Sequence, residues 1–418
     1  MKSCVLCLLS AGILLAQPAA DPKDTARKAL DLLLAHKYAD MLPLFAPVSR
    51  TSNPPDALAK KVEDAWGAMV SVGAAQVRPL PTSSIVSVPV KFAKAEVTYV
   101  FGVDSTGAIT GIGTQVDPWK HPDYSKPDSF KERELTIGDK WKLPATLTVP
   151  NGAGPFPAVV LVHDSGQGDV DELVGMVKVF RDLAEGLASN GVAVLSYEKR
   201  TRAYPSVMQS PDYTAETEII DDAVLALGVL RAQPEVKQSK VYALGYGWGG
   251  YLMPRIAEAD GKLAGMIILN GNERPWEDLA LDLAAYLGIT GPQLAVIREG
   301  AAKIKALTPG DVDTQPLLGL RGPYLLDLKG YDPTGQSKLL KLPMLILQGE
   351  RDFQVTMKDF AAWKSGLQGM PGVTLKSYPA LDHVLVEGTG KSQTADYRKP
   401  GQHVSQTVVD DVAKWVKQ

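Results

Sequence analysis

The sequence is poor in cysteine and histidine and carries little net charge. Both cysteines, Cys4 and Cys7, lie near the start of the chain. If that segment is removed on export, the remaining chain has no disulfide, no thiolate zinc site and no cysteine nucleophile. The five histidines are widely spaced, so we expect no metal site, and no motif predicts another cofactor. A net charge of −3 argues against nucleic acid as a partner, because phosphate binding needs a basic patch.

Long apolar runs are also missing, apart from one at residues 5–16. This run follows Lys2 and precedes small residues up to Ala20, which is typical of a secretory signal peptide over residues 1–20. A run this short cannot cross a bilayer as a helix. We therefore expect an exported protein, periplasmic or extracellular, with no stable membrane span. An exported chain without disulfides is compatible with a bacterial periplasm.

The length of 418 residues predicts two domains. Residues 22–116 favour a small α+β domain, in which two helices, the second over residues 57–70, precede strands rich in Val, Tyr and Phe. Residues 117–130 contain three prolines and are predicted to be a linker.

Residues 131–418 alternate between apolar runs of strand length and amphipathic helices. This alternation predicts an α/β fold with a doubly wound, mostly parallel sheet. It stops between Asn270 and Lys341, a stretch too long for a connecting loop. We expect a helical cap insertion at about residues 272–341, over the carboxyl ends of the strands, where open sheets bind ligands.

Residues 241–250 read as a buried strand, a tight glycine turn and the start of a helix. This is the layout of a nucleophile elbow with the pattern G-x-S-x-G, in which a strained turn lifts a serine above the sheet. The serine position is residue 247, and it is Gly247. The sequence therefore has the turn that mounts a nucleophile but not the nucleophile.

Two further polar residues follow strands later in the chain. The predicted strand at residues 342–347 leads to Asp352, and the one at residues 373–378 leads to His383. Nucleophile, acid and histidine occur in this order in one large class of serine hydrolases. We expect Asp352 to fix the tautomer of His383, and His383 to be the general base.

Taken together and in order, these stretches resemble the α/β-hydrolase superfamily, in particular secreted bacterial serine-hydrolase-like proteins with a small N-terminal α+β domain. The resemblance extends from residue 132 to residue 418. It is carried by residues 160–166, 195–201, the elbow, 349–352, and His383 with Glu387 and Gly388. It implies hydrolysis of esters, thioesters or small amides through an acyl-serine, with a small acyl or ester molecule as ligand.

The sequence departs from the family pattern at Gly247, at Asp164, where glycine is usual, and at Tyr246, where histidine is common. The loop of His163, Asp164 and Ser165 is expected to help bind the oxyanion. An ionised Asp164 pointing inward would oppose an oxyanion by roughly 4 kcal/mol at about 4 Å, whereas one pointing outward would not. Ser165 is a poor substitute nucleophile because it lies on this loop. Trp248 is expected near the pocket.

Three hypotheses about function follow. The favoured one is a degenerate or repurposed ester or thioester hydrolase, a pseudoenzyme that binds a small molecule or a partner. The alternative is an active hydrolase or lyase that uses Asp352 and His383 as a general base, without an acyl-serine intermediate. The third is a weak or altered ester hydrolase. The missing serine leaves open whether the protein is an enzyme, since fold alone does not decide function.

Overall fold

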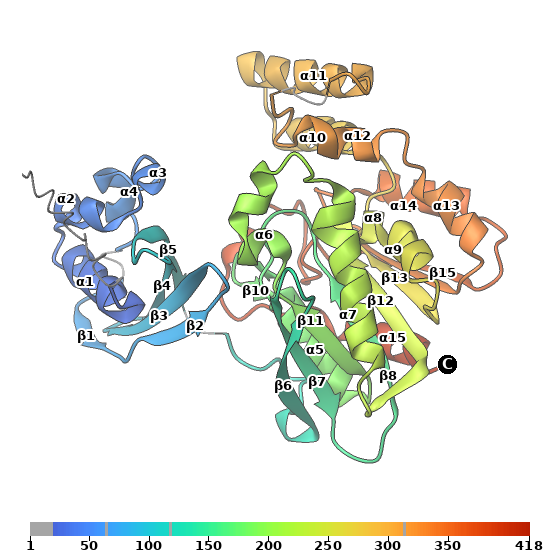
Figure 1. Ribbon diagram of the computed structural model, residues 1–418, viewed down its shortest axis with the longest axis horizontal. Coiled ribbons are helices and arrows are strands. Elements are labelled where there is room, and N and C mark those ends of the chain that lie inside the picture. The colour runs from blue at the N-terminus through green and yellow to red at the C-terminus, as the bar shows by residue number, and fades with distance from the viewer. Residues whose placement is uncertain (1–19, 63–65, 117–118, 312–314) are drawn as a thin grey trace, which may run out of the picture. The chain divides into compact units, whose positions relative to one another are not determined.

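The computed structural model describes residues 20–62, 66–116, 119–311 and 315–418, and the signal peptide expected at residues 1–20 lies outside them except for its last residue. The chain forms two compact units, Met1–Pro118 and Trp119–Gln418 (Figure 1). Among the described residues, no helix has the length and apolar character needed to span a bilayer.

The N-terminal unit packs short helices against a small antiparallel sheet. Its strands are ordered β1-β3-β4-β5, and β2 also pairs with β3. One hydrophobic cluster, drawn from the helices and the inner face of the sheet, forms its core. The elements are α1 (Pro22–Leu34), α2 (Tyr38–Met41), α3 (Pro47–Arg50), α4 (Pro55–Ala59), β1 (Met69–Val72), β2 (Gln76–Pro79), β3 (Ser83–Phe92), β4 (Glu96–Asp104) and β5 (Ile109–Val116).

The prediction of a single helix over residues 57–70 is wrong. Helix α4 ends at Ala59, and strand β1 already begins at Met69. Gly67 has a φ of +77°, a left-handed conformation that ends a helix. The carbonyl of Trp66 accepts a hydrogen bond from the turn between β3 and β4, so this stretch is held by the sheet.

Most of the segment expected as a linker packs on the C-terminal unit. Trp119 Nε1 donates to Asp182 at 2.9 Å, and the ring of His121 lies 2.7 Å from Glu185. Both carboxylates lie on α5 (Val179–Ser189). The division between the two units therefore falls at residues 118 and 119, before most of the prolines that suggested a linker over residues 117–130.

The C-terminal unit contains an eight-stranded sheet in the order β15-β14-β13-β12-β8-β11-β7-β6. The strands from β15 to β11 run parallel, and β7 and β6 continue the sheet antiparallel. Their bounds are β6 (Phe130–Ile137), β7 (Leu143–Pro150), β8 (Phe156–Val162), β11 (Ala193–Tyr197), β12 (Val236–Tyr246), β13 (Gly265–Leu269), β14 (Met344–Gly349) and β15 (Val373–Tyr378). A short hairpin, β9 (Leu173–Val174) and β10 (Val177–Lys178), lies apart from this sheet.

Helices cover both faces of the sheet, because successive strand residues point to opposite sides. Val160 and Val162 belong to one core, with α7 (Asp221–Arg231), α9 (Met253–Asp260) and α14 (Met357–Gly366). Val159 and Leu161 belong to the other, with α5 and α15 (Gln406–Lys417). A continuous apolar run such as β8 is what two covered faces require.

Between β13 and β14 the chain forms the predicted helical insertion. It contains α10 (Trp276–Tyr286), α11 (Gly291–Ala306), α12 (Gly322–Leu328) and α13 (Pro333–Leu340). Figure 1 shows α10, α11 and α12 stacked beyond the sheet, on the side where α8 (Trp248–Tyr251) begins. The predicted fold is confirmed: a doubly wound, mostly parallel α/β-hydrolase sheet with a helical insertion, preceded by an α+β unit.

Candidate active site

The turn between β12 and α8 has the geometry of a nucleophile elbow. Gly247 has φ +52° and ψ −112°, a conformation that strains any residue with a side chain but not glycine. Its N–H donates to the carbonyl of Leu269 at 3.0 Å. The flanking glycines are needed for packing, since a Cβ atom at Gly245 would lie 2.3 Å from the carbonyl oxygen of Gly249. The turn is thus intact although the serine is absent.

The side chain of Asp164 fills the space where a nucleophile would project. A Cβ atom at residue 247 would lie 2.2 Å from Asp164 Oδ1 and 2.3 Å from its Cγ, far inside van der Waals contact. Of the two orientations that the sequence left open, Asp164 therefore points inward. Glycine at position 247 and aspartate at position 164 are sterically coupled, because a serine or an alanine at position 247 requires this carboxylate to move.

The two oxygens of Asp164 have different partners. Oδ1 accepts hydrogen bonds from the backbone N–H groups of Trp248 and Ser165, both at 2.7 Å. Oδ2 lies 3.2 Å from His383 Nε2. Burial alone would raise the pKa of Asp164, but the hydrogen bond and charge of His383 and the two backbone hydrogen bonds together hold the pKa below its usual value. The side chain is an ionised carboxylate, one fifth exposed.

His383 is held between two carboxylates. Its Nδ1 lies 2.7 Å from Asp352 Oδ2, and Asp352 Oδ1 accepts from the N–H groups of Gln354 and Val355. Burial lowers the pKa of His383, but the charge of Asp352 and the hydrogen bond with Asp164 outweigh it and raise the pKa to about 10. The ring is therefore an imidazolium at neutral pH, with a negative partner on each nitrogen.

Asn270 connects the loops that carry the acid and the histidine, and the sequence analysis missed it. It follows β13 with a φ of +46°, a conformation that asparagine tolerates better than most residues. Its Nδ2 donates to the carbonyl of His383 at 2.7 Å, and its Oδ1 accepts from Gly349 N at 2.8 Å. An asparagine at the carboxyl end of a central strand was the available sequence signal.

A buried polar chain supports Asp164 from behind. Lys199 Nζ donates to the backbone carbonyl of Asp164 at 2.7 Å and pairs with Glu218 at 2.8 Å. Glu218, on the π-helical turn η5 (Glu216–Ile220), accepts from the hydroxyl of Tyr324 at 2.6 Å. Tyr324 in turn accepts from Trp248 Nε1 at 2.9 Å. The chain thus joins the Asp164 loop to the residue after the elbow.

Two residues expected at the pocket, His163 and Tyr246, are buried, and their polar side-chain atoms form hydrogen bonds inside the protein. The ring nitrogens of His163 lie 2.5 Å from Glu172 and 2.6 Å from the carbonyl of Tyr197. Tyr246 is fully buried, and its hydroxyl donates to the carbonyl of His383 at 3.1 Å. Both residues position neighbouring loops. Ser165 is exposed, and what it gives to the site is its backbone N–H.

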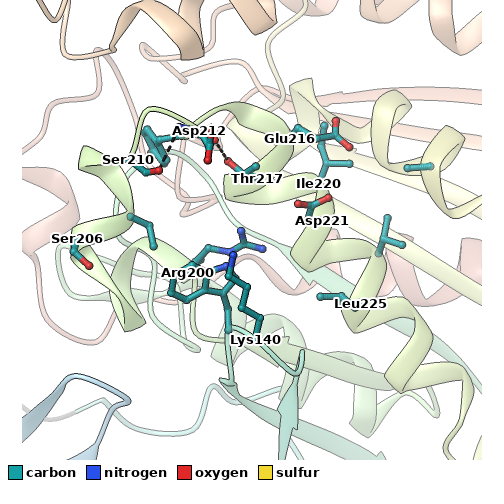
Figure 2. A pocket seen from close by; sticks show the side chains of 15 residues that line it. Lys140, Arg200, Ser206, Ser210, Asp212, Glu216, Thr217, Ile220, Asp221 and Leu225 are labelled. Atoms are coloured by element: carbon teal, nitrogen blue, oxygen red, sulfur yellow. Dashed lines mark hydrogen bonds between the residues drawn. The ribbon is translucent and has the colours of Figure 1, made fainter.

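A separate cavity of about 690 Å³ lies elsewhere in the same unit (Figure 2). It is lined by residues from the β6–β7 turn, from the segment after β11 and from η5 and α7, and Asp164, Gly247 and His383 are not among them. The described residues contain no group of three or more His, Cys, Asp or Glu side chains that could hold a metal ion.

An elbow turn with an acid–histidine pair behind it, on a mostly parallel sheet, is the architecture of the α/β-hydrolase fold. The sequence profile of the dienelactone hydrolase family matches residues 143–292. Esterase EstD of Thermotoga maritima is 36% identical over 336 residues, which cover 78% of each chain. The chain therefore belongs to the dienelactone hydrolase family, an esterase-type hydrolase family with the α/β-hydrolase fold.

Solved structures with similar folds include Est1E from Butyrivibrio proteoclasticus, with 17% identity and a TM-score of 0.45, covering 68% of this chain and 99% of that one. An esterase of Pyrococcus furiosus has 14% identity and a TM-score of 0.44, covering 72% and 97%.

Proposed function

We propose that this protein is a repurposed member of its esterase-type family, in which hydrolysis through an acyl-serine is lost and Asp164 occupies the vacated nucleophile position. The observation that carries the proposal is that a Cβ atom placed on residue 247 would lie only 2.2 Å from Asp164 Oδ1. A chain under selection for a serine at this turn has to leave room for it. Here the room is taken by a carboxylate with three hydrogen-bonding partners.

Each part of the acyl-serine mechanism is affected. The nucleophile is absent at Gly247. The two backbone N–H groups placed to bind an oxyanion, from Trp248 and Ser165, already bind Asp164 Oδ1. The base has to be a neutral imidazole, but the pKa of His383 is raised to about 10. Ester hydrolysis by this route is therefore not expected at neutral pH.

The proposal includes a small acyl or ester-like molecule as the ligand, because the elbow turn and the acid–histidine pair are present, with a helical insertion between β13 and β14. It also keeps export to the periplasm or the extracellular space, which is supported by the composition of residues 1–20.

The test is to measure hydrolysis of p-nitrophenyl acetate and p-nitrophenyl butyrate at pH 7.5, together with labelling by a fluorophosphonate probe. A serine esterase is the positive control. We expect no burst, no turnover above that of a catalytically inert protein, and no labelling. Stoichiometric labelling of any serine in the unaltered protein would refute the proposal.

The alternative function, general-base hydrolysis by Asp352 and His383, is favoured by their 2.7 Å contact. It requires a deprotonated His383. Because the pKa of His383 is about 10, such activity would rise with pH up to about 10. It would extend to lower pH in Asp164→Asn, which removes one of the two charges that raise this pKa. A rate that is flat between pH 7 and 10 in both proteins excludes this mechanism.

A further inference from the structure

The cavity of about 690 Å³ shown in Figure 2 is large enough for a small-molecule ligand. It is separate from the candidate active site, because Asp164, Gly247 and His383 do not line it. The apolar part of its wall comes from the segment after β11, from η5 and from α7, and consists of Val207, Tyr213, Ile220, Val224 and Leu225. This wall suits the apolar body of a ligand, and the charged residues around it determine which class of ligand fits.

Two cationic residues, Lys140 and Arg200, lie together on one side of the cavity (Figure 2). The indole ring of Trp141 holds both, since its centroid lies 5.2 Å from Lys140 Nζ and 5.8 Å from the guanidinium carbon of Arg200. Only 8% of the Arg200 side chain is exposed. Its Nε and Nη2 donate to Asp222, which leaves Nη1 outside this pair. Lys140 has no ion-pair partner among the described residues. This side therefore offers a positive charge and fixed N–H donors to a carboxylate.

Acidic residues face these cations. Figure 2 shows Asp212 and Glu216 on the opposite side of the cavity, with Asp221 between the two groups. Glu216 is already paired with Arg255 at 2.9 Å. The hydrogen bonds of Asp212 use its backbone N–H and carbonyl, so its carboxylate stays available. In the part of the chain that the structure describes, neither Asp212 nor Asp221 has an ion-pair partner. Two uncompensated carboxylates therefore face the cavity.

We propose that this cavity binds a short peptide with apolar side chains. The carboxylate of the peptide meets Lys140 and Arg200, and its ammonium group meets Asp212 and Asp221. A ligand of a single charge would pair with one side and be repelled by the other, whereas a zwitterion pairs with both. A single amino acid carries both charges on one carbon and cannot reach opposite sides of the cavity, but a dipeptide or tripeptide separates them. The inference stands apart from the proposed function, since the two sites have different residues.

The exposure of the charged residues determines how they act. Arg200 is buried, so its contact with a carboxylate is shielded from water. Lys140, Asp212 and Asp221 are exposed, so their contacts with the peptide compete with water and with salt. Binding should therefore weaken as salt is added. The same exposure means that these three residues can be replaced without disturbing the core.

The test measures binding of the dipeptide L-leucyl-L-leucine to the full chain by isothermal titration calorimetry, together with two analogues that each lack one charge. The N-acetyl form lacks the ammonium group, and the amide form lacks the carboxylate. We expect the dipeptide to bind, and each analogue to bind about tenfold more weakly, as for the loss of two exposed or partly exposed ion pairs.

Variants assign each charge of the peptide to its partner. A variant with both Asp212→Asn and Asp221→Asn should bind the dipeptide about tenfold more weakly and should no longer distinguish it from the N-acetyl form. Lys140→Gln should weaken binding of the dipeptide by about fivefold and leave binding of the amide form unchanged. Glu299→Gln, which removes an exposed carboxylate on α11, should bind all three ligands as the unaltered protein does.

No binding of the dipeptide at concentrations up to about 10 mM would overturn the inference. Two other results would also overturn it, namely an N-acetyl form that binds as tightly as the dipeptide, and equal weakening of all three ligands in the charge variants. Thermal unfolding of each variant shows whether it is folded. Failure of this test leaves the proposed function standing, because that proposal is tested by fluorophosphonate labelling at a different site.

Discussion

Asp164→Asn removes one of the two negative charges that face His383, and the structure gives the size of the effect. The charges lie 3.2 Å apart. Coulomb's law gives about 1 kcal/mol in water and about 5 kcal/mol at an effective dielectric of roughly 20. Since about 1.4 kcal/mol corresponds to a pKa change of one, the pKa of His383 should fall from about 10 by about 1 to 4.

The assay is an NMR titration of the histidine ring protons, which is tractable because the chain has only five histidines. His383→Gln identifies the His383 signal. Glu299→Gln, which removes an exposed carboxylate on α11, is the control for the loss of a negative charge. The signal should not move between pH 6 and 8 in the unaltered protein, and its midpoint should be lower in Asp164→Asn. A midpoint near 6.5 in the unaltered protein, or no change in the variant, would refute the reasoning.

The same pKa predicts how stability depends on pH. The pKa of His383 is higher in the folded chain, about 10, than the roughly 6.5 of an unfolded one. The stabilisation from its protonation is therefore complete below about pH 6.5 and is lost as pH rises to about 10. In urea unfolding at pH 6, 8 and 10, the unaltered protein should lose more unfolding free energy than Asp164→Asn. Equal losses of unfolding free energy in the two proteins would contradict the claim that the charge of Asp164 raises the pKa of His383.

Three further predictions concern the support of the site and the two units. Lys199→Met leaves Glu218 buried without its cation and should lower the unfolding free energy by about 3–5 kcal/mol; a loss below 1 kcal/mol in urea would contradict it. Asn270→Ala leaves buried groups unpaired on two loops and should cost about 1–3 kcal/mol for each group, so unchanged thermal stability would argue against its role. The fragment 119–418 should unfold cooperatively by calorimetry, because its cores share no residue with the N-terminal core; a fragment without a transition would contradict this.

The fold was predictable because its signals are local and repeated. The apolar run of β8 and the alternation of strands and helices predict a parallel sheet, and the spacing of Asp352 and His383 after their strands brings them into contact. The prediction of a helix over residues 57–70 failed because residues 66–68 pair with the β3–β4 turn, and because Gly67 has a left-handed conformation that a continuous helix cannot contain.

The state of the site was harder to predict because it depends on a contact between distant residues. The sequence shows that position 247 lacks serine and that position 164, on the oxyanion loop of the same site, has a carboxylate, but it does not show whether this carboxylate points toward position 247. The pKa of His383 depends on that contact. The role of Asn270 was missed for a related reason, since its partners are a backbone carbonyl and a backbone N–H group on other loops, which leave no trace in the residue pattern.

The central claim is that Asp164 occupies the nucleophile position. The most direct measurement compares p-nitrophenyl acetate turnover and fluorophosphonate labelling in four proteins: unaltered, Gly247→Ser, Asp164→Gly, and the double variant. A serine at residue 247 overlaps Asp164 Oδ1 at 2.2 Å, so the account predicts that only the double variant is labelled and turns over ester. If Gly247→Ser alone is as active as the double variant, the claim that Asp164 occupies the nucleophile position is contradicted.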